Sequence, residues 1–491
     1  MSRTFPFRAQ AFRAPALIWL ALAVVVGLLA ATQPPAVTAV LLALAAFALL
    51  GAITPLSALA ALLILAPLRN LVATEAPGGL PLDVGQIAFL ALVGFWVIHS
   101  IARHRTLPVL RPSIVQLPVV IFIIATALTA FTALSLGAWL NEWLKWVSVL
   151  LLIAICLDLG SWHWIIFALV LSGVANAVIG IYEFFGGSGA LHLLISNRFF
   201  RAFGTFGQPN PFGGFMGLIA PIALMAALGY ACRVWAAWRA VHILPTAALA
   251  AAAFYALSSV LLVAGLVMSW SRGAWLGFAA ALLAILFALP RRWSYGAAAM
   301  AVVVALIVFL WINGLLPASV VSRIESATDE LVAFNDARGI DINPDNFANV
   351  ERLAHWQAAF NMAQSNPWLG VGFGNYEIAY SQYNLINWKM ALGHAHNYYL
   401  NVFAEAGIIG LISYVALWLT IMALTWRARR HPDPLARLIA VGLLGTWTYL
   451  AVHSLTDNLY VNNLFLHLGV LLGVLALLYR FQNAKIIMRM E

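Results

Sequence analysis

Long apolar runs, separated by short polar or charged segments, follow one another along almost the whole chain. A helix needs roughly 20 apolar residues to cross a bilayer core about 30 Å thick. About fourteen runs approach that length when charge, Pro and Gly are taken as boundaries. The pattern predicts an all-α fold, a polytopic transmembrane bundle of about 12–14 spans. The runs centre near Val24, Ala43, Leu62, Leu92, Ile124, Leu151, Leu169, Leu218, Leu257, Ala281, Val304, Ile412, Leu444 and Leu471.

Two polar interruptions are longer than a turn, at residues 186–210 and 317–395. In the second interruption, apolar residues recur at helical spacing between Asn346 and Gln364, while Glu351 and Arg352 lie on another face. This pattern predicts an amphipathic helix that lies on or above the membrane. Residues 329–346, rich in Asp and Asn, predict an irregular lid. The apolar positions of the expected helix are Phe347, Val350, Leu353, Ala354, Ala358 and Met362.

Composition supports a membrane protein and argues against a nucleic-acid-binding one. The chain is 64% hydrophobic and only 9% charged, whereas soluble domains have about 25% charged residues. Its net charge of +9 comes from small Lys and Arg clusters between apolar runs, so topology explains the charge better than nucleic acid does. Cys156 and Cys232 form neither a CxxC motif nor a Cys/His cluster, so a disulfide framework or zinc site is not predicted.

The basic clusters also orient the chain, because cytoplasmic loops collect Lys and Arg. Placing the N-terminus inside puts most clusters in inner segments and most acidic residues outside. We therefore expect a multi-pass protein of the plasma (inner) membrane with both termini cytoplasmic and both long polar segments extracytoplasmic. The inner clusters are Arg3, Arg8 and Arg13; Arg103, Arg105 and Arg111; Arg233 and Arg239; Arg291 and Arg292; Arg427, Arg429, Arg430 and Arg437; and Arg480, Lys485 and Arg489.

Arg272 is an outer arginine that departs from this trend. It follows a long apolar run and precedes Gly273, where the next span begins. A guanidinium there offers a bidentate fork suited to phosphate. The alternative is an interfacial anchor beside Trp270 and Trp275. Arg201 raises a similar choice, because its Gly-rich loop either approaches a ligand or serves as a connection.

The end of the long outer loop carries His394 and His396 just before a span. A His there can act as a general base for a hydroxyl; the alternative is an interfacial His among tyrosines. The two could share a metal if the segment is extended, but no third ligand is evident nearby. Lys145 and Asp457 are weaker candidates that could equally pair within the bundle.

Six segments, in the order in which they follow one another along the chain, resemble the O-antigen ligase and polymerase superfamily. Its members are polytopic enzymes that transfer glycans from undecaprenyl pyrophosphate. The six segments cover residues 201–210, 271–277, 351–356, 366–376, 396–400 and 405–410. The resemblance divides the chain into N-terminal spans at 1–185, a ligase-like core at 186–410 with both outer loops, and C-terminal spans with a short cytoplasmic tail at 411–491.

The resemblance implies that His396 activates the acceptor hydroxyl for inverting attack and that Arg201 and Arg272 bind the lipid-linked pyrophosphate. Asn397, next to His396 in its motif, and Lys145 and Asp457 are further substrate-binding candidates. The expected partners are the lipid-linked glycan donor, a glycan, lipid or protein acceptor, and membrane lipids; no metal, cofactor or nucleic acid is implied. The alternatives are a transporter or flippase of lipid-linked saccharides and a protein O-oligosaccharyltransferase.

Overall fold

The computed structural model describes residues 54–75, 82–187, 189–195, 197–242, 244–316, 321, 336–343 and 346–490. Within these ranges, ten helices are long and apolar enough to cross a membrane, and two shorter apolar helices accompany them. They coincide with the twelve predicted runs from Leu62 onward, which confirms the all-α polytopic fold. The predicted runs near Val24 and Ala43 lie outside the described residues, as does half of the expected lid at 329–346.

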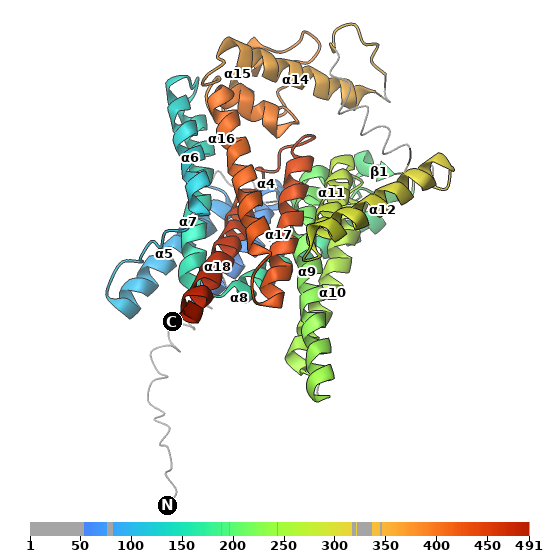
Figure 1. The fold of residues 1–491 in the computed structure, drawn as a ribbon. Helices are drawn as coiled ribbons and strands as arrows, with labels where there is room; N and C mark the ends of the chain where they lie inside the picture. Colours follow the sequence, from blue (N-terminus) through green and yellow to red (C-terminus); the bar gives the residue numbers. More distant parts are fainter. Residues whose placement is uncertain are drawn as a thin grey trace, which may run out of the picture.

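The first half of the bundle runs from α3 to α8, with helices and connections arranged around the C-terminal α18 (Figure 1). The elements are α3 (Pro55–Leu65), α4 (Arg69–Glu75), α5 (Val84–His104), α6 (Gln116–Ala127), α7 (Leu136–Leu159) and α8 (Trp162–Tyr182). A small antiparallel hairpin, β1 (Leu194–Ile195) and β2 (Phe199–Phe200), then interrupts the helical fold.

The second half pairs long helices that return through the bundle. Its helices are α9 (Pro209–Val241), α10 (Thr246–Met268), α11 (Arg272–Ala288), α12 (Trp293–Ile312), α14 (Phe347–Ser365), α15 (Tyr376–Ala379), α16 (Tyr398–Ala428), α17 (Pro434–His453) and α18 (Leu464–Met490). The helix α17 packs along α9 and α11, so these three helices join segments distant in sequence.

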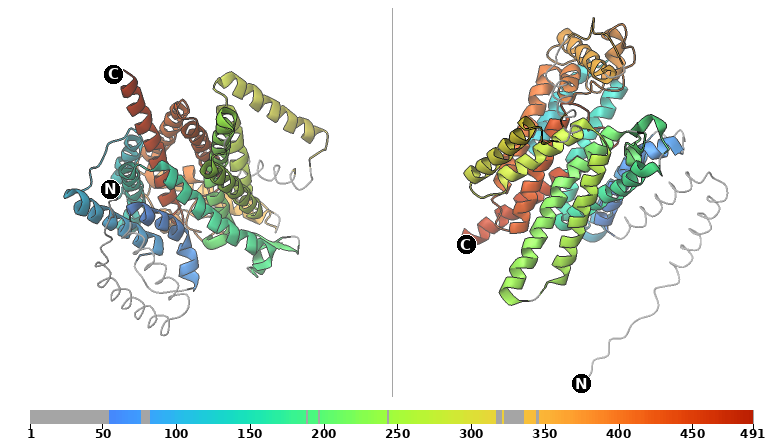
Figure 2. Two further views of the ribbon diagram at one scale, coloured as in Figure 1. Left: turned by 90° about the horizontal axis from the view of Figure 1, so that it is seen from below. Right: turned by 90° about the vertical axis from the view of Figure 1, so that its right-hand side faces the viewer.

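Burial differs sharply between helices. In the most apolar window of α18, 83% of residues are buried, and in that of α17, 78%, whereas the value for α12 is 6%. The helix α12 projects from the side of the bundle (Figure 2). Because a helix that is apolar all round and lacks protein neighbours needs an apolar solvent, its surface is suited to lipid.

The predicted amphipathic helix is present as α14, which packs against α16 at the upper end of the bundle (Figure 1). Its buried face includes Val350, Ala354, Ala358 and Met362, as the helical spacing predicted.

The loop formed by residues 366–376, which follows α14, is bound to the backbone of α16. The backbone N–H groups of Val371 and Gly372 donate to carbonyls of Ala404 and Glu405 (both 3.0 Å). Next to them, Gly407 has φ +61°, and a Cβ there would lie 2.3 Å from the backbone of Trp368. The helix α16 is therefore broken at a glycine, which lets the loop pack directly on its backbone.

Candidate active site

A cleft of about 170 Å³ lies where the chain enters α9 and α11 and leaves α17, next to α14. Three arginines from distant segments contribute to its walls. The lining residues are Arg201, Asn210, Trp270, Ser271, Arg272, Gly273, Ala348, Arg352, His453, Thr456 and Asp457.

Arg201 is placed by a loop that is tied down on both sides. Its backbone N–H donates to Leu193 (2.8 Å), and the next residue, Ala202, donates to the carbonyl of Met268 at the end of α10 (3.0 Å). Its guanidinium donates to the carbonyl of Ser269 (3.1 Å) and to the Oδ1 of Asn210 (3.2 Å). The Gly-rich segment thus positions Arg201 at the cleft, rather than serving only as a connection.

Arg272 is the first residue of α11, so its side chain starts from a helix N-terminus, the end of a helix that attracts anions. Its guanidinium donates to the Oδ1 of Asn349 (3.1 Å), which belongs to α14. Gly273 follows, and a Cβ there would lie 2.1 Å from the Oγ1 of Thr456. The glycine therefore allows the start of α11 to approach the segment after α17.

Arg352 is the third cleft arginine, although the sequence pattern predicted only that it lies on a polar face of the amphipathic helix. Asn349 precedes it by three positions, and residues three apart lie on the same side of a helix. One face of α14 therefore supplies both Arg352 and the hydrogen-bond partner of Arg272. The signal in the sequence that could have identified Arg352 was its place in the 351–356 segment of the family resemblance.

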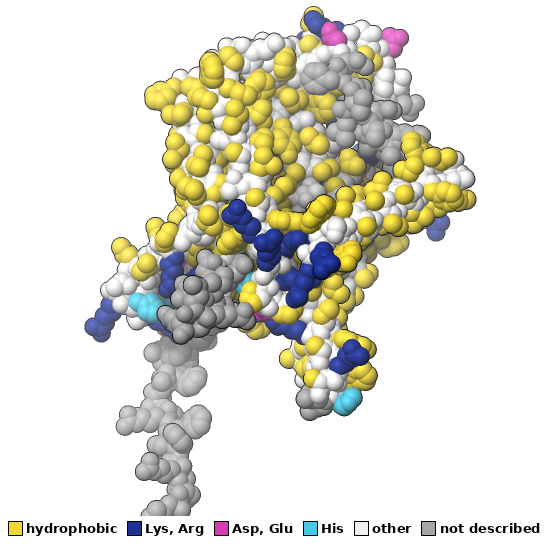
Figure 3. All heavy atoms as spheres, in the orientation of Figure 1, with side chains coloured by type: hydrophobic (Ala, Val, Ile, Leu, Met, Phe, Trp, Pro, Cys, Tyr) yellow, Lys and Arg dark blue, Asp and Glu magenta, His cyan; other side chains and the backbone are white. Residues whose placement is uncertain are grey.

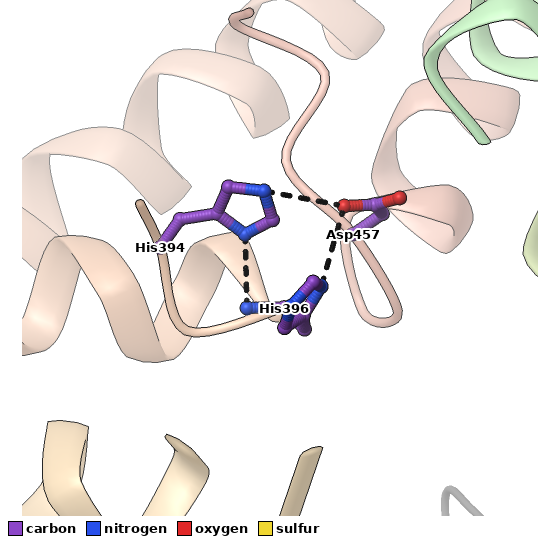
Figure 4. Close-up of side chains that lie close together, drawn as sticks. All are labelled: His394, His396 and Asp457. Atoms are coloured by element: carbon purple, nitrogen blue, oxygen red, sulfur yellow. Dashed lines mark hydrogen bonds and ion pairs between the residues drawn. The ribbon is translucent and has the colours of Figure 1, made fainter. Parts of the chain in front are cut away.

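His394, His396 and Asp457 meet beside the cleft (Figure 4). The Oδ1 of Asp457 lies 3.6 Å from the Nε2 of His394 and 3.8 Å from the Nδ1 of His396. The backbone N–H of His396 donates to the Nδ1 of His394 (3.1 Å). His396 itself has φ +52°, a conformation uncommon for a residue with a side chain, of the kind that clusters at functional sites.

The electrostatics of this group favour an ionised Asp457 and a neutral His394. Burial opposes ionisation of Asp457, but the imidazoles of His396, His394 and His453 hold the pKa of its carboxyl below its usual range. Burial lowers the pKa of His394 to about 4, against the opposing effect of Asp457. The negative charge of the group therefore resides on the carboxylate of Asp457.

The same three side chains offer ligand atoms within 4.8 Å of one another, so they could hold a metal ion. Asp457 is the third ligand that the sequence did not reveal. The hydrogen bond between the two histidines argues against metal binding, however. The Nδ1 of His394 accepts an N–H, so a neutral ring carries its proton on Nε2, the atom that a metal would need unprotonated. We interpret the group as two imidazoles in charge contact with Asp457.

His453, at the end of α17, adds another nitrogen to the cleft. The hydroxyl of Tyr449 donates to the carbonyl of Gly213 (2.9 Å) and lies 2.8 Å from the Nδ1 of His453. The Nδ1 is therefore the donor of the second bond, and the Nε2 presents a lone pair. This Nε2 is buried and has no hydrogen-bond partner among the described residues.

Two other candidates occupy different positions. Asn397 caps the N-terminus of α16, where its side chain accepts the N–H of Leu400 (3.1 Å). Lys145 pairs with Glu142 (2.5 Å) within α7 and is not among the residues that line the cleft. Their assignment to substrate binding stays a prediction.

Fold and site together define a multi-pass helical membrane protein with a basic cleft at one end of its bundle. Residues 257–415 match the family model described as O-antigen ligase. A curated O-antigen ligase of Pseudomonas aeruginosa (strain PAO1) is 31% identical to this chain over 111 residues, which are 23% of the chain and 24% of that relative. These matches confirm the resemblance that the motifs indicated, and they cover about a quarter of the relative's length.

Proposed function

We propose that the chain is a membrane glycosyltransferase of the O-antigen ligase type. In this proposal it transfers a glycan from undecaprenyl pyrophosphate to an acceptor hydroxyl on the extracytoplasmic face. One observation carries the proposal: Arg201, Arg272 and Arg352 line a single cleft, and Asp457 in its wall contacts His394 and His396. The match to O-antigen ligases over residues 257–415 supports it.

The arginines would hold the leaving group. Pyrophosphate gains charge as it departs, and fixed cations lower the free energy of that transition state. Three guanidiniums and the N-terminus of α11 converge on the cleft, and both kinds of group bind phosphate oxygens well. They would supply the positive charge that a divalent metal supplies in other enzymes.

His396 would be the general base. Its Nδ1 faces Asp457, so the ring would carry its proton on Nδ1 and leave Nε2 unprotonated. The acceptor oxygen would form a bond to the anomeric carbon while the Nε2 of His396 takes the proton of the hydroxyl. The bond between the anomeric carbon and the phosphate oxygen would break, and its electron pair would leave with undecaprenyl pyrophosphate. The 3.8 Å contact is long for a hydrogen bond; catalytic contacts of this kind often tighten once substrate binds.

The test uses the purified full chain in lipid vesicles with undecaprenyl-pyrophosphate-linked glycan and three acceptors: lipid A core, a free glycan repeat and a peptide. Mass spectrometry of the product would separate ligase, polymerase and protein O-oligosaccharyltransferase. Translocation of the donor without transfer to any acceptor would point to the flippase alternative and contradict the proposal.

The His396→Ala variant should lose transfer by about 10²–10⁴-fold, the usual contribution of a general base, while inserting at normal levels. His192→Ala is the matched control, because His192 is an exposed His of the other outer loop. Normal transfer by His396→Ala would remove the catalytic role of His396.

A further inference from the structure

A second basic cavity lies at the opposite end of the α11–α17 pair from the cleft. It has a volume of about 270 Å³, and four arginines with one histidine make up its polar lining. No acidic side chain belongs to this lining, within the part of the chain that the structure describes. The lining residues are Ala288, Pro290, Arg291, Arg429, Arg430, His431, Pro432 and Arg437, and we call this cavity the arginine basket.

Figure 3 shows where basic side chains gather on this face of the molecule. A compact group of Lys and Arg side chains lies near the lower end of α17 and the start of α12, beneath an extensive apolar surface. The arginine basket thus opens where the apolar part of the bundle ends. The positive-inside pattern of the sequence predicts this end to be cytoplasmic.

Arg429 forms the fixed floor of the arginine basket. It is only 9% exposed, it donates to the carbonyls of Ala288 (3.1 Å) and Pro290 (3.2 Å), and its guanidinium stacks 3.7 Å above the ring of Trp426. Its Nε is nevertheless buried without a hydrogen-bond partner among the described residues. A buried donor left unpaired is costly, so an incoming acceptor would stabilise this site.

Among the described residues, no acidic side chain in the lining offsets the charge of these arginines. The carboxylate that follows in sequence, Asp433, is already engaged by the Nη2 of Arg233, with both oxygens at 3.1 Å. Burial, followed by the neighbouring Arg430 and Arg437, lowers the pKa of Arg429. An anion bound among these side chains would relieve both the repulsion and the missing hydrogen bond.

We propose that the arginine basket binds the phosphate group of an anionic glycerophospholipid. Guanidiniums bind phosphate through paired hydrogen bonds, and basic pockets between transmembrane helices on the cytoplasmic side bind anionic head groups. The location at the end of apolar helices favours a lipid, whose acyl chains lie along the apolar surface, over soluble phosphate. This site is distinct from the cleft and does not depend on the proposed glycan transfer.

The test measures the thermal stability of the full chain in neutral detergent. Phosphatidylglycerol, phosphatidylcholine and inorganic phosphate are added separately at equal phosphate concentration. Phosphatidylglycerol should raise the Tm in a saturable way, and the other two should not. The variants are Arg430→Gln and Arg291→Gln, whose side chains are exposed; Arg429 is left intact because it holds the end of α11. Each variant should need about tenfold more phosphatidylglycerol for the same shift, as expected when one charge-assisted contact is lost.

Arg239→Gln is the matched control, because Arg239 is exposed near the end of α9 and does not line the cavity. It should respond like the unmodified protein. An equal Tm rise with inorganic phosphate would overturn the lipid as the source of the phosphate. The site itself would be overturned if Arg239→Gln weakened the phosphatidylglycerol effect as much as the cavity variants do. It would also be overturned if phosphatidylglycerol did not raise the Tm of the unmodified protein.

Discussion

The two ends of the α11–α17 helix pair both gather arginines, but their other charged groups differ. The cleft end combines Arg201, Arg272 and Arg352 with the carboxylate of Asp457 and adjacent histidines. The arginine basket has four arginines and His431, with no carboxylate in its lining. Arginines alone can bind an anion, whereas proton transfer also needs a base held by a carboxylate. In our proposals, the cleft therefore carries out the chemistry and the arginine basket binds an anion.

Arg272 at the cleft and Arg429 in the arginine basket are also held in different ways. Arg272 donates to a side-chain amide on α14, whereas Arg429 donates to backbone carbonyls at the end of α11. A side-chain partner can change its rotamer when a ligand arrives, but a carbonyl at a helix end is fixed by the helix. We therefore expect the cleft to rearrange around its substrate and the arginine basket to stay rigid.

The largest effect should come from Asp457→Asn. An amide donates as well as accepts, so it no longer fixes the proton of His396 on Nδ1, and transfer should fall by about 10²–10⁴-fold. The measurement is the rate of transfer in vesicles at saturating donor. Asp433→Asn is the matched control at the other end of α17, where the carboxylate pairs with Arg233. A comparable loss in both variants would contradict the division between the two ends.

Gly273→Ala should have the next largest effect. The new Cβ would meet the Oγ1 of Thr456 and the ring of His453, which would push Arg272 away from Asp457. Displacing a positioned group by about 1 Å can reduce a rate by roughly 10²-fold. Gly94→Ala is the control, because a Cβ at this helical glycine meets nothing within 4 Å. Full transfer by Gly273→Ala would mean that the close approach is unimportant.

Arg272→Lys should weaken donor binding by about tenfold, since it keeps the charge but loses the bidentate fork. The KM for the lipid-linked donor is the measurement. Arg198→Lys is the control, because Arg198 is an exposed arginine of the loop before α9 that does not line the cleft. An unchanged KM in Arg272→Lys would favour the interfacial anchor.

The smallest effect concerns pH and stability. Burial lowers the pKa of His394 from 6.5 to about 4, so the unfolded chain takes up this proton before the folded protein does. The free energy of unfolding should therefore fall as the pH is lowered from about 6.5 to about 4, and this contribution is fully present above that window.

The apparent Tm at a fixed scan rate, measured across that pH window, tests this contribution. His394→Gln should flatten the decline, and His192→Gln, an exposed histidine, should not. An identical decline in all three proteins would contradict the assignment to His394.

The sequence predicted the elements whose signal is local. Run length located every described span, and the 3.6-residue spacing identified the buried face of α14, including Val350 and Ala354. Long-range pairings carry no such signal. The contact between His394 and Asp457 depends on how the end of α17 meets the loop before α16, where the N–H of Tyr398 donates to Ser454 (2.8 Å). Asp457 could therefore be chosen as a candidate residue, but its partners could not be identified.

The residues of the six motif segments fall into two groups, those at the cleft and those that support the fold, and the sequence could not show which residue belongs to which group. Arg201 and Arg272 reach the cleft, whereas Glu405 and the 366–376 segment brace the loop that carries α14. A resemblance in sequence does not distinguish a residue that meets a ligand from one that supports the fold, because a motif does not say where its side chains lie. Only the spatial arrangement separates the two groups.

The length of α11 has a consequence for the surrounding bilayer. Its 17 residues rise about 26 Å, which is less than the roughly 30 Å of a typical hydrocarbon core. Arginines at both of its ends, Arg272 and Arg291, resist being drawn into the acyl region. Lipid beside this helix must therefore compress, and hydrophobic mismatch of this kind makes a membrane protein sensitive to acyl-chain length. We therefore expect activity to depend on the acyl-chain length of the surrounding lipid, because bilayer thickness sets the height of the head groups relative to the cleft.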